Sequence, residues 1–246
     1  MYLTIQAVVL RVTDYNDRDA LLTVLSKNHG KLTVKARGLR RRNNPLIAPC
    51  QLLAYGEFTL FEYRGMYTIN EAHSIELFQN LRRDLTKLSL GTYFAQAAEV
   101  ISQEDLPNPE LQLLLLNSLY ALSALNISES QVKAAFELRA ACLAGYLPDL
   151  SGCHICGSHY PDCFDLSAGQ LECYHCSRGE GGIRIPINPG ILQAMEYICT
   201  CESRRLFQFS LGNENVDKLA SLTEAYLSTQ LERGFSTLDF YKSLLI

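Results

Sequence analysis

Four cysteines, arranged as two C-x2-C pairs, are the feature that most limits what this chain can fold into. Cys153 and Cys156 form the first pair, Cys173 and Cys176 form the second, and sixteen residues separate the two pairs. Each pair brings two sulfurs onto one turn, so two facing turns supply four ligands to a tetrahedral ion. The array therefore predicts one bound Zn²⁺ in segment 151–183, which is too short and too polar to build a core of its own.

The predicted zinc is structural, because four thiolates leave no coordination position open for water or a substrate. A catalytic or redox centre and a disulfide pair are the weaker alternatives. Other side chains of the same region remain alternative ligands in place of one of the four cysteines: Cys163, His154, His159 and His175.

The cysteine count and the N-terminal sequence indicate a reducing compartment. The chain has nine cysteines, and its start, MYLTIQAVVLRV, lacks the basic residues and the uninterrupted apolar run of a secretory signal. We therefore expect a cytoplasmic protein. The most apolar stretch, 111–127, is interrupted by polar residues and is shorter than the roughly 20 apolar residues of a membrane span, so a buried helix is expected there and no membrane contact.

Residues 1–80 have the alternation and β-branched content of strands. The expected strands are 2–12, 20–27, 31–38, 52–63 and 66–77, with a turn at Asn28–Gly30 and another at Arg64–Gly65. Five strands in so short a segment favour a small closed barrel, and the OB-fold is the common barrel of this kind that binds oligonucleotides. The loop after residue 38 is expected to add little to the barrel core.

Helical spacing replaces strand alternation after residue 80. Helices are expected at 84–102, 111–126, from Ser128 to Gly145, at 190–200 and at 215–233, with Ser128 and Asn188 as N-caps and Gly234 ending the last one. The sequence thus predicts a multidomain α+β protein. An OB-fold at 1–80 precedes an α-helical domain at 81–246, which carries the zinc-binding insert at 151–183.

Positive charge gathers in the N-terminal part of an otherwise acidic chain. Residues 1–80 hold ten Lys or Arg and seven Asp or Glu, whereas residues 81–246 hold twelve and nineteen. Six cations fall within twelve residues: Lys31, Lys35, Arg37, Arg40, Arg41 and Arg42. Cations on one strand face, followed by a mobile basic loop, are suited to binding a phosphodiester backbone. The alternative is a charged strand edge that prevents aggregation.

Two tyrosines and two further arginines extend the nucleic-acid hypothesis. Tyr63 and Tyr67 flank the Arg64 turn, either as stacking platforms for bases or as barrel packing. Arg178 and Arg184, in and just beyond the cysteine segment, are the second place where DNA contacts are sought.

No catalytic motif accompanies these features. The chain has no H-x-E with a downstream P-C-x-x-C, no H-E-x-x-H, no G-x-x-x-x-G-K-[ST] and no G-x-S-x-G. A zinc deaminase, a metalloprotease, a P-loop ATPase and an α/β-hydrolase are therefore unsupported. We assign no catalytic residue and expect a protein that is not an enzyme.

Several motifs, taken in order, resemble the RecO family along the whole chain. They are YNDRDALLTVL at 15–25 followed by His29-Gly30-Lys31, KARGLRRR at 35–42, FELRAACLAGYLPDLSGCHICG at 136–157 and LERGFSTLDFYKSLL at 231–245. The third is the most specific, because it joins a helix end, a Gly-Tyr-x-Pro turn and the first cysteine pair.

The resemblance implies an OB-fold, a helical domain with a zinc module, and a recombination mediator active on nucleoid DNA. Such a protein would bind single- and double-stranded DNA, anneal complementary strands and help RecA displace single-strand-binding protein (SSB), with RecR as partner. It also implies a groove for the acidic, hydrophobic tail of SSB, for which Arg139, Arg204 and Arg205 are the expected rim cations. Two other classes stay open, namely an RNA-binding or transcription-associated zinc-ribbon factor and an interaction scaffold.

Overall fold

The computed structural model describes residues 1–176 and 182–245 and divides the chain into two compact units. The first comprises Met1–Leu125 with Phe235–Ile246, and the second comprises Asn126–Gly234. The domain division expected from the sequence, at residue 80 with an insert at 151–183, stays a prediction.

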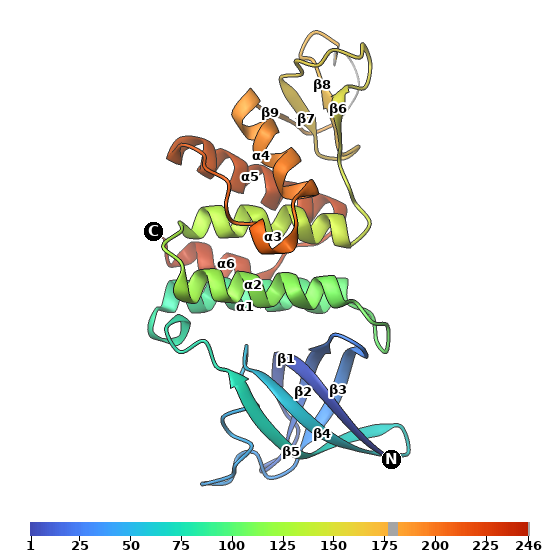
Figure 1. Ribbon diagram of the computed structural model, residues 1–246, viewed down its shortest axis with the longest axis vertical. Coiled ribbons are helices and arrows are strands. Elements are labelled where there is room, and N and C mark those ends of the chain that lie inside the picture. The colour runs from blue at the N-terminus through green and yellow to red at the C-terminus, as the bar shows by residue number, and fades with distance from the viewer. Residues whose placement is uncertain (177–181, 246) are drawn as a thin grey trace. The chain divides into compact units, whose positions relative to one another are not determined.

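A closed five-stranded barrel forms the N-terminal part of the first unit, as predicted (Figure 1). The strand order around the barrel is β1-β2-β3-β5-β4, and every pairing is antiparallel except β3 with β5. The strands are β1 Tyr2–Asp14, β2 Ala20–Ser26, β3 Gly30–Ala36, β4 Tyr55–Tyr63 and β5 Met66–Glu76. Strand β4 begins three residues later than the expected start at residue 52, because Leu52 and Leu53 form a turn that the Ala54 N–H closes by donating to the Gln51 carbonyl.

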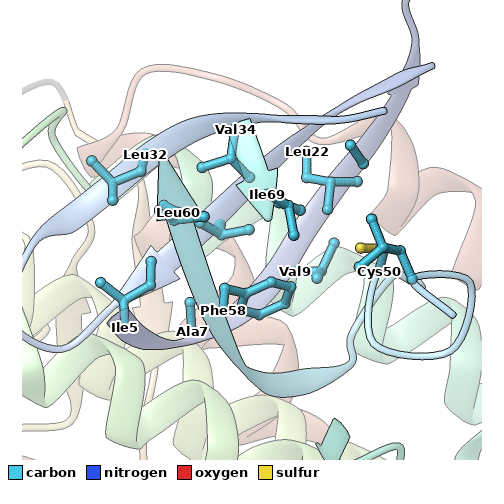
Figure 2. Packing of buried hydrophobic residues seen from close by; sticks show 13 residues of the cluster. Ile5, Ala7, Val9, Leu22, Leu32, Val34, Cys50, Phe58, Leu60 and Ile69 are labelled. Carbon is cyan, nitrogen blue, oxygen red and sulfur yellow. The ribbon is translucent and has the colours of Figure 1, made fainter. Parts of the chain in front are cut away.

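Alternate residues of the strands fill the barrel. Figure 2 shows this cluster, in which Phe58 and Leu60 of β4 meet Ile5 of β1 and Val34 of β3. The loop between β3 and β4 contributes to the same core, since Leu46 and Cys50 are buried in it. The expectation that this loop adds little to the core was therefore wrong, because its apolar side chains pack inside the barrel.

A short 3-10 helix, Leu81–Arg83, and three α-helices complete the described part of the first unit: α1 Leu85–Ile101, α2 Pro109–Ala124 and α6 Ser236–Ser243. The Asp84 carboxylate caps α1 by accepting the Thr86 and Lys87 backbone N–H groups. Tyr93 of α1 packs edge-on against Phe235, which precedes α6. Across the described residues, no helix combines the length and the apolar character needed to cross a membrane.

The second unit consists of helices and a small four-stranded sheet (Figure 1). Its helices are α3 Glu129–Leu143, α4 Pro189–Thr200 and α5 Asn213–Gln230, and its strands are β6 Asp149–Cys153, β7 Cys163–Asp165, β8 Gln170–Glu172 and β9 Arg184–Pro186. Ser128 and Asn188 cap α3 and α4 as predicted. Helix α5 ends at Gln230 rather than near Gly234, because Glu232 already has a positive φ of 51°.

A buried charged cluster joins α3 to α5. The Lys133 ammonium lies 2.9 Å from Glu137 and 2.8 Å from Glu224, and the Lys133 and Glu137 side chains are 6% and 0% exposed. Thr223 also donates to the Glu137 carboxylate, at 2.8 Å. The cluster satisfies a fully buried carboxylate, as the interior of a protein requires.

Candidate metal centre and nucleic-acid interface

The four cysteines of the two C-x2-C pairs converge on one point in the second unit. The sulfurs of Cys153, Cys156, Cys173 and Cys176 all lie within 4.8 Å of one another. Cys153 ends β6, and the Gly157 N–H donates to its carbonyl at 2.7 Å, which closes the first turn. The Cys176 N–H closes the second turn by donating to the Cys173 carbonyl at 2.9 Å. The predicted cluster is therefore present and has the donor set of a tetrahedral metal site.

Electrostatics in this cluster favour a bound cation. Burial acts to raise the pKa of Cys153, but backbone N–H groups directed at its sulfur outweigh burial and lower that pKa to about 6. Burial and the neighbouring thiols raise the pKa of Cys173 to about 11, and Cys156 raises that of Cys176 to about 12. The thiols oppose one another's ionisation, so four thiolates need a positive ion among them.

The alternative ligands stand outside this cluster. Cys163, His154, His159 and His175 are not members of the group of converging ligand atoms found among the described residues. Cys163 is buried on β7, and the His154 Nδ1 lies 3.4 Å from the Leu171 carbonyl oxygen. Arg184 is held by Glu172 at 2.6 Å, and Arg178 lies outside the described residues.

Two of the six predicted DNA-binding cations, Lys31 and Lys35, are mostly buried beside partners inside the first unit. The Lys31 ammonium donates to the Glu99 carbonyl at 3.2 Å and to the Ser102 carbonyl at 3.0 Å, at the end of α1. Lys35 lies 3.0 Å from the Asp19 carboxylate and 4.6 Å from the centre of the Tyr15 ring. Their charges are partly neutralised, because each side chain is only 17–18% exposed beside these partners.

The remaining four cations, Arg37, Arg40, Arg41 and Arg42, are exposed on the turns that follow β3. Arg40 pairs with the Asp14 carboxylate at 2.9 Å, and both of these side chains are at least half exposed. Arg37, Arg41 and Arg42 form no ion pair with any described residue. Three exposed guanidinium groups are thus available to a ligand.

Hydrogen bonds hold these turns in place. The Asp19 carboxylate accepts the Gly38 N–H at 2.8 Å, and the Asn44 amide donates to the Gly38 carbonyl. The Gly38 N–H, followed by Lys35 and Asn16, lowers the pKa of Asp19 to about 2. The basic loop is therefore anchored at its start, and the mobility expected of the residues beyond it stays a prediction.

An aromatic hollow adjoins the exposed arginines. Tyr2, Phe61 and Tyr63 line a pocket of about 370 Å³ together with Arg37, and Tyr2 and Tyr63 are 63% and 60% exposed. The Tyr2 and Phe61 ring centres are 5.2 Å apart. A second hollow, of about 540 Å³, shares Arg37, Ile69 and Asn70 with the first and extends along β5 to Ser74. Arg37 thus lies where the two hollows meet.

Sequence reasoning found part of this aromatic surface. Tyr63 is exposed, and the Arg64 guanidinium lies 5.2 Å from its ring centre, whereas Tyr67 is half-buried and packs against the barrel core. Tyr2 and Phe61 were missed. Strand alternation could have found Phe61, because Phe58 and Leu60 face the core and residues 61 and 63 fall on the opposite face.

The three arginines expected to meet a partner lie near the end of α4. Arg204 and Arg205 are exposed, while the Arg139 guanidinium donates to the Cys201 carbonyl at 2.6 Å. An apolar groove of about 600 Å³ exists in this unit, but it lies between the start of α4 and α5, and none of the three lines it. Its rim carries Glu214, Asp217 and Lys218.

Comparisons with known proteins agree over the whole chain. Residues 1–78 match the family model described as "Recombination protein O N terminal", and residues 82–239 match "Recombination protein O C terminal". The chain is 34% identical over 245 residues to the "DNA repair protein RecO" of Acetivibrio thermocellus, covering 99% of this chain and 97% of that protein. It is 28% identical over 247 residues to the protein of the same name from Alkaliphilus metalliredigens, covering 99% and 100%.

Proposed function

The chain belongs to the RecO family, and from that premise we propose that it is a recombination mediator without catalytic turnover. The family supports a role in DNA repair and recombination. The finer role proposed is to bind single- and double-stranded DNA, to anneal complementary strands and to assist RecA loading onto SSB-coated DNA together with RecR. This activity takes place in the cytoplasm, on nucleoid DNA.

The observation that carries this proposal is the set of unpaired arginines beside the aromatic hollow. Arg41 and Arg42 supply charge to phosphates, and Arg37 stands between the charged turns and the rings of Tyr2, Phe61 and Tyr63. Cationic grooves that track the backbone, combined with aromatic rings on which bases stack, bind single strands without sequence preference. The second hollow, along β5, continues the path from Arg37.

Counterion release provides the first test. Each single-strand phosphate neutralised by the protein adds a slope of roughly −0.7 to the plot of log K against log salt concentration. Replacing Arg40, Arg41 and Arg42 together by Ala should therefore flatten that slope by about two units. Affinity should fall equally for all sequences, because phosphate contacts carry no base information.

The control removes two exposed arginines from the second unit, Arg204 and Arg205, by substitution with Ala. This variant should keep the wild-type salt slope for DNA. If the barrel variant also keeps the wild-type slope while circular dichroism shows it folded, the turns after β3 do not bind DNA. Greater aggregation with an unchanged slope would support the alternative that these arginines only protect a strand edge.

Base stacking provides the second test. Tyr63→Ala should weaken single-strand binding by about 5- to 150-fold, from roughly 1–3 kcal/mol for one stacked base, and should leave duplex binding nearly unchanged. The matched control is Tyr160→Ala, since Tyr160 is 89% exposed in the second unit. Equal losses for single strands and duplexes would rule out stacking at Tyr63. Higher affinity of the wild type for RNA than for single-stranded DNA would favour the RNA-binding alternative.

The four-cysteine cluster is proposed to hold one structural Zn²⁺. The ligands are Cys153, Cys156, Cys173 and Cys176, and the metal would cross-link β6 to the turn after β8. Its effect on DNA binding is expected to be indirect, through the fold of the second unit.

The SSB tail is proposed to bind near the exposed Arg204 and Arg205, with Arg139 as the third cation. The acidic rim of the apolar groove between α4 and α5 would repel an acidic peptide, so that groove is not the proposed site. Single Ala variants of the three arginines should weaken binding of an acidic tail peptide, measured by fluorescence anisotropy. Unchanged affinity in all three would eliminate these residues as the contact.

A further inference from the structure

Three cysteines apart from the metal cluster gather at one place in the second unit. Cys142 lies in the last turn of α3, Cys199 in the last turn of α4, and Cys201 directly after α4. The sulfurs of Cys142 and Cys199 are 3.7 Å apart, which is van der Waals contact, and all three side chains are half-buried. The two thiols are therefore in contact, and each residue keeps part of its surface exposed.

A guanidinium group without a carboxylate partner stands beside these sulfurs. Arg139, three residues before Cys142 on α3, donates from Nη2 to the Cys201 carbonyl and lies 3.3 Å from the Cys201 sulfur. Its Nε is buried and has no hydrogen-bond partner, and Arg139 forms no ion pair among the described residues. A partly buried cation of this kind favours a nearby anion, and the ionisable groups beside it are thiols.

The same arrangement acts on Cys142 itself. The hydrogen bond with Cys199 lowers the pKa of Cys142, burial opposes this, and the positive charge of Arg139 lowers that pKa further. Thiolates are the nucleophilic form of cysteine, and redox-active cysteines are accessible, have a cation nearby and lie next to a second thiol. Cys142 and Cys199 meet each of these conditions through their positions alone.

We propose that Cys142 and Cys199 form a reversible oxidation site, in which hydroperoxides convert the two contacting thiols into a disulfide that links α3 to α4. This site is distinct from the four-cysteine metal cluster and does not depend on the proposed role in recombination.

The chemistry requires only a hydroperoxide as oxidant. The Cys142 thiolate attacks one peroxide oxygen, the O–O bond breaks, and the released hydroxide is protonated to water. The resulting sulfenic acid is then attacked by the Cys199 sulfur, the S–O bond breaks, and hydroxide leaves with the Cys199 proton as a second water. Two thiols and one hydrogen peroxide thus give one disulfide and two waters, and two electrons pass from sulfur to oxygen.

The geometry allows the second step. A disulfide bond is about 2.05 Å long, so the two sulfurs must approach by roughly 1.7 Å from their separation of 3.7 Å. Rotation of the two side chains shares this movement, and both residues lie one position before the end of their helices, where the backbone has the fewest constraints. Cys201 is the less suitable partner, because its sulfur and carbonyl are engaged by Arg139.

The test uses the full-length, zinc-loaded protein. Limiting hydrogen peroxide is added, free thiols are blocked with N-ethylmaleimide, and the unreduced protein is digested with trypsin and chymotrypsin, which separate Cys142 from Cys153 by cleaving after Leu143 and Tyr146. Mass spectrometry should find the Cys142 peptide joined to the peptide holding Cys199 and Cys201, with two hydrogens lost. Dithiothreitol should reverse the link, and metal analysis should show that zinc is retained.

Substitutions assign the link and the role of the cation. Cys142→Ser and Cys199→Ser should each abolish the link, while Cys201→Ser should keep it. Arg139→Met should slow formation of the link several-fold, and Arg139→Lys should restore part of the rate, with circular dichroism confirming the fold of each variant. The proposal is overturned if Cys142 and Cys199 remain free until zinc has been lost, or if Cys201→Ser abolishes the link.

Discussion

Replacing Lys133 by Met should destabilise the second unit strongly. In the wild type the Lys133 ammonium lies 2.9 Å from Glu137 and 2.8 Å from Glu224, and the Glu137 side chain is 0% exposed. Met preserves the side-chain volume but leaves the fully buried Glu137 carboxylate without its cation, while the hydrogen bond from Thr223 remains. Removing one partner of a buried ion pair costs about 3–5 kcal/mol, which corresponds to a fall of about 6–20 °C in melting temperature for a chain of this length.

The chain offers a matched control for this experiment. Lys218 also forms an i,i+4 pair, with Glu214 at 2.7 Å, but the two side chains are 55% and 85% exposed. Lys218→Met should therefore leave the melting temperature nearly unchanged. The thermal transition of each variant is followed by far-UV circular dichroism, which reports helix content. Lys133→Met together with Glu137→Met should be less damaging than Lys133→Met alone, because no buried carboxylate remains. If Lys133→Met has the same melting temperature as Lys218→Met, the buried cluster does not hold α3 against α5.

The same cluster predicts a pH dependence. Burial acts to lower the pKa of Lys133, but Glu137 and Glu224 outweigh it and raise that pKa above 10.5. A group whose pKa is raised on folding stabilises the folded state below its unfolded pKa and loses that effect as pH rises through the folded value. The stability difference between the wild type and Lys133→Met should stay constant from neutral pH to about pH 10 and shrink above it. If the stability difference already begins to shrink before the rising pH reaches about 9, the pKa of Lys133 is not raised.

Three further predictions concern the metal, catalysis and the basic loop. Metal analysis should find one zinc per chain. The Cys173→Ala variant should lose the zinc and show faster hydrogen exchange in the β6–β9 sheet, because metal binding there is coupled to folding. Full zinc occupancy in that variant would refute the assigned ligands. Purified protein should show no ATP hydrolysis, and a turnover abolished by a point substitution would disprove this. Asp19→Asn should weaken protection of the Gly38 amide from exchange and lower DNA affinity. In the wild type the Gly38 amide should stay protected as the pH falls from about 7 to about 5. The pKa of Asp19 is lowered to about 2, so its carboxylate stays ionised over this range.

Alternation of apolar side chains explains why the barrel was predictable. In β3, Leu32, Val34 and Ala36 are buried and the residues between them are not, which is the pattern that the sequence shows. Two-residue periodicity depends only on the strand itself, so it is visible without knowing the partner strands. The cysteine cluster was predictable for a similar reason, because C-x2-C spacing fixes two ligands on one turn.

Elements that depend on distant contacts were missed. Strands β7, β8 and β9 have three residues each, too few for a periodicity to show, and their pairing around the cysteine cluster sets them. Helix α6 has eight residues, and it packs through contacts such as that of the preceding Phe235 with Tyr93. Leu46 and Cys50 lie in a loop without repeat, so their burial in the barrel followed only from the fold.

Prediction of the interface had the same limit. Spacing showed that six cations lie close together in the chain, but it could not show that Lys31 and Lys35 meet partners far away in sequence. The exposed rings of Tyr2 and Phe61 come from two neighbouring strands, β1 and β4, whose pairing places Tyr2 opposite Phe61. Side-chain alternation gives the outward direction of Phe61, whereas the register that brings the two rings together needs the structure.

The attachment of Lys31 to the end of α1 affects how fragments of this protein behave. Its ammonium neutralises the carbonyls of Glu99 and Ser102, which carry the negative end of the helix dipole. A fragment truncated before α1 would release this cation to solvent and add one positive charge to the barrel surface. DNA affinity measured on such a fragment would then exceed the barrel's contribution in the intact chain, and its salt slope would be steeper by roughly 0.7 if the released ammonium meets a phosphate.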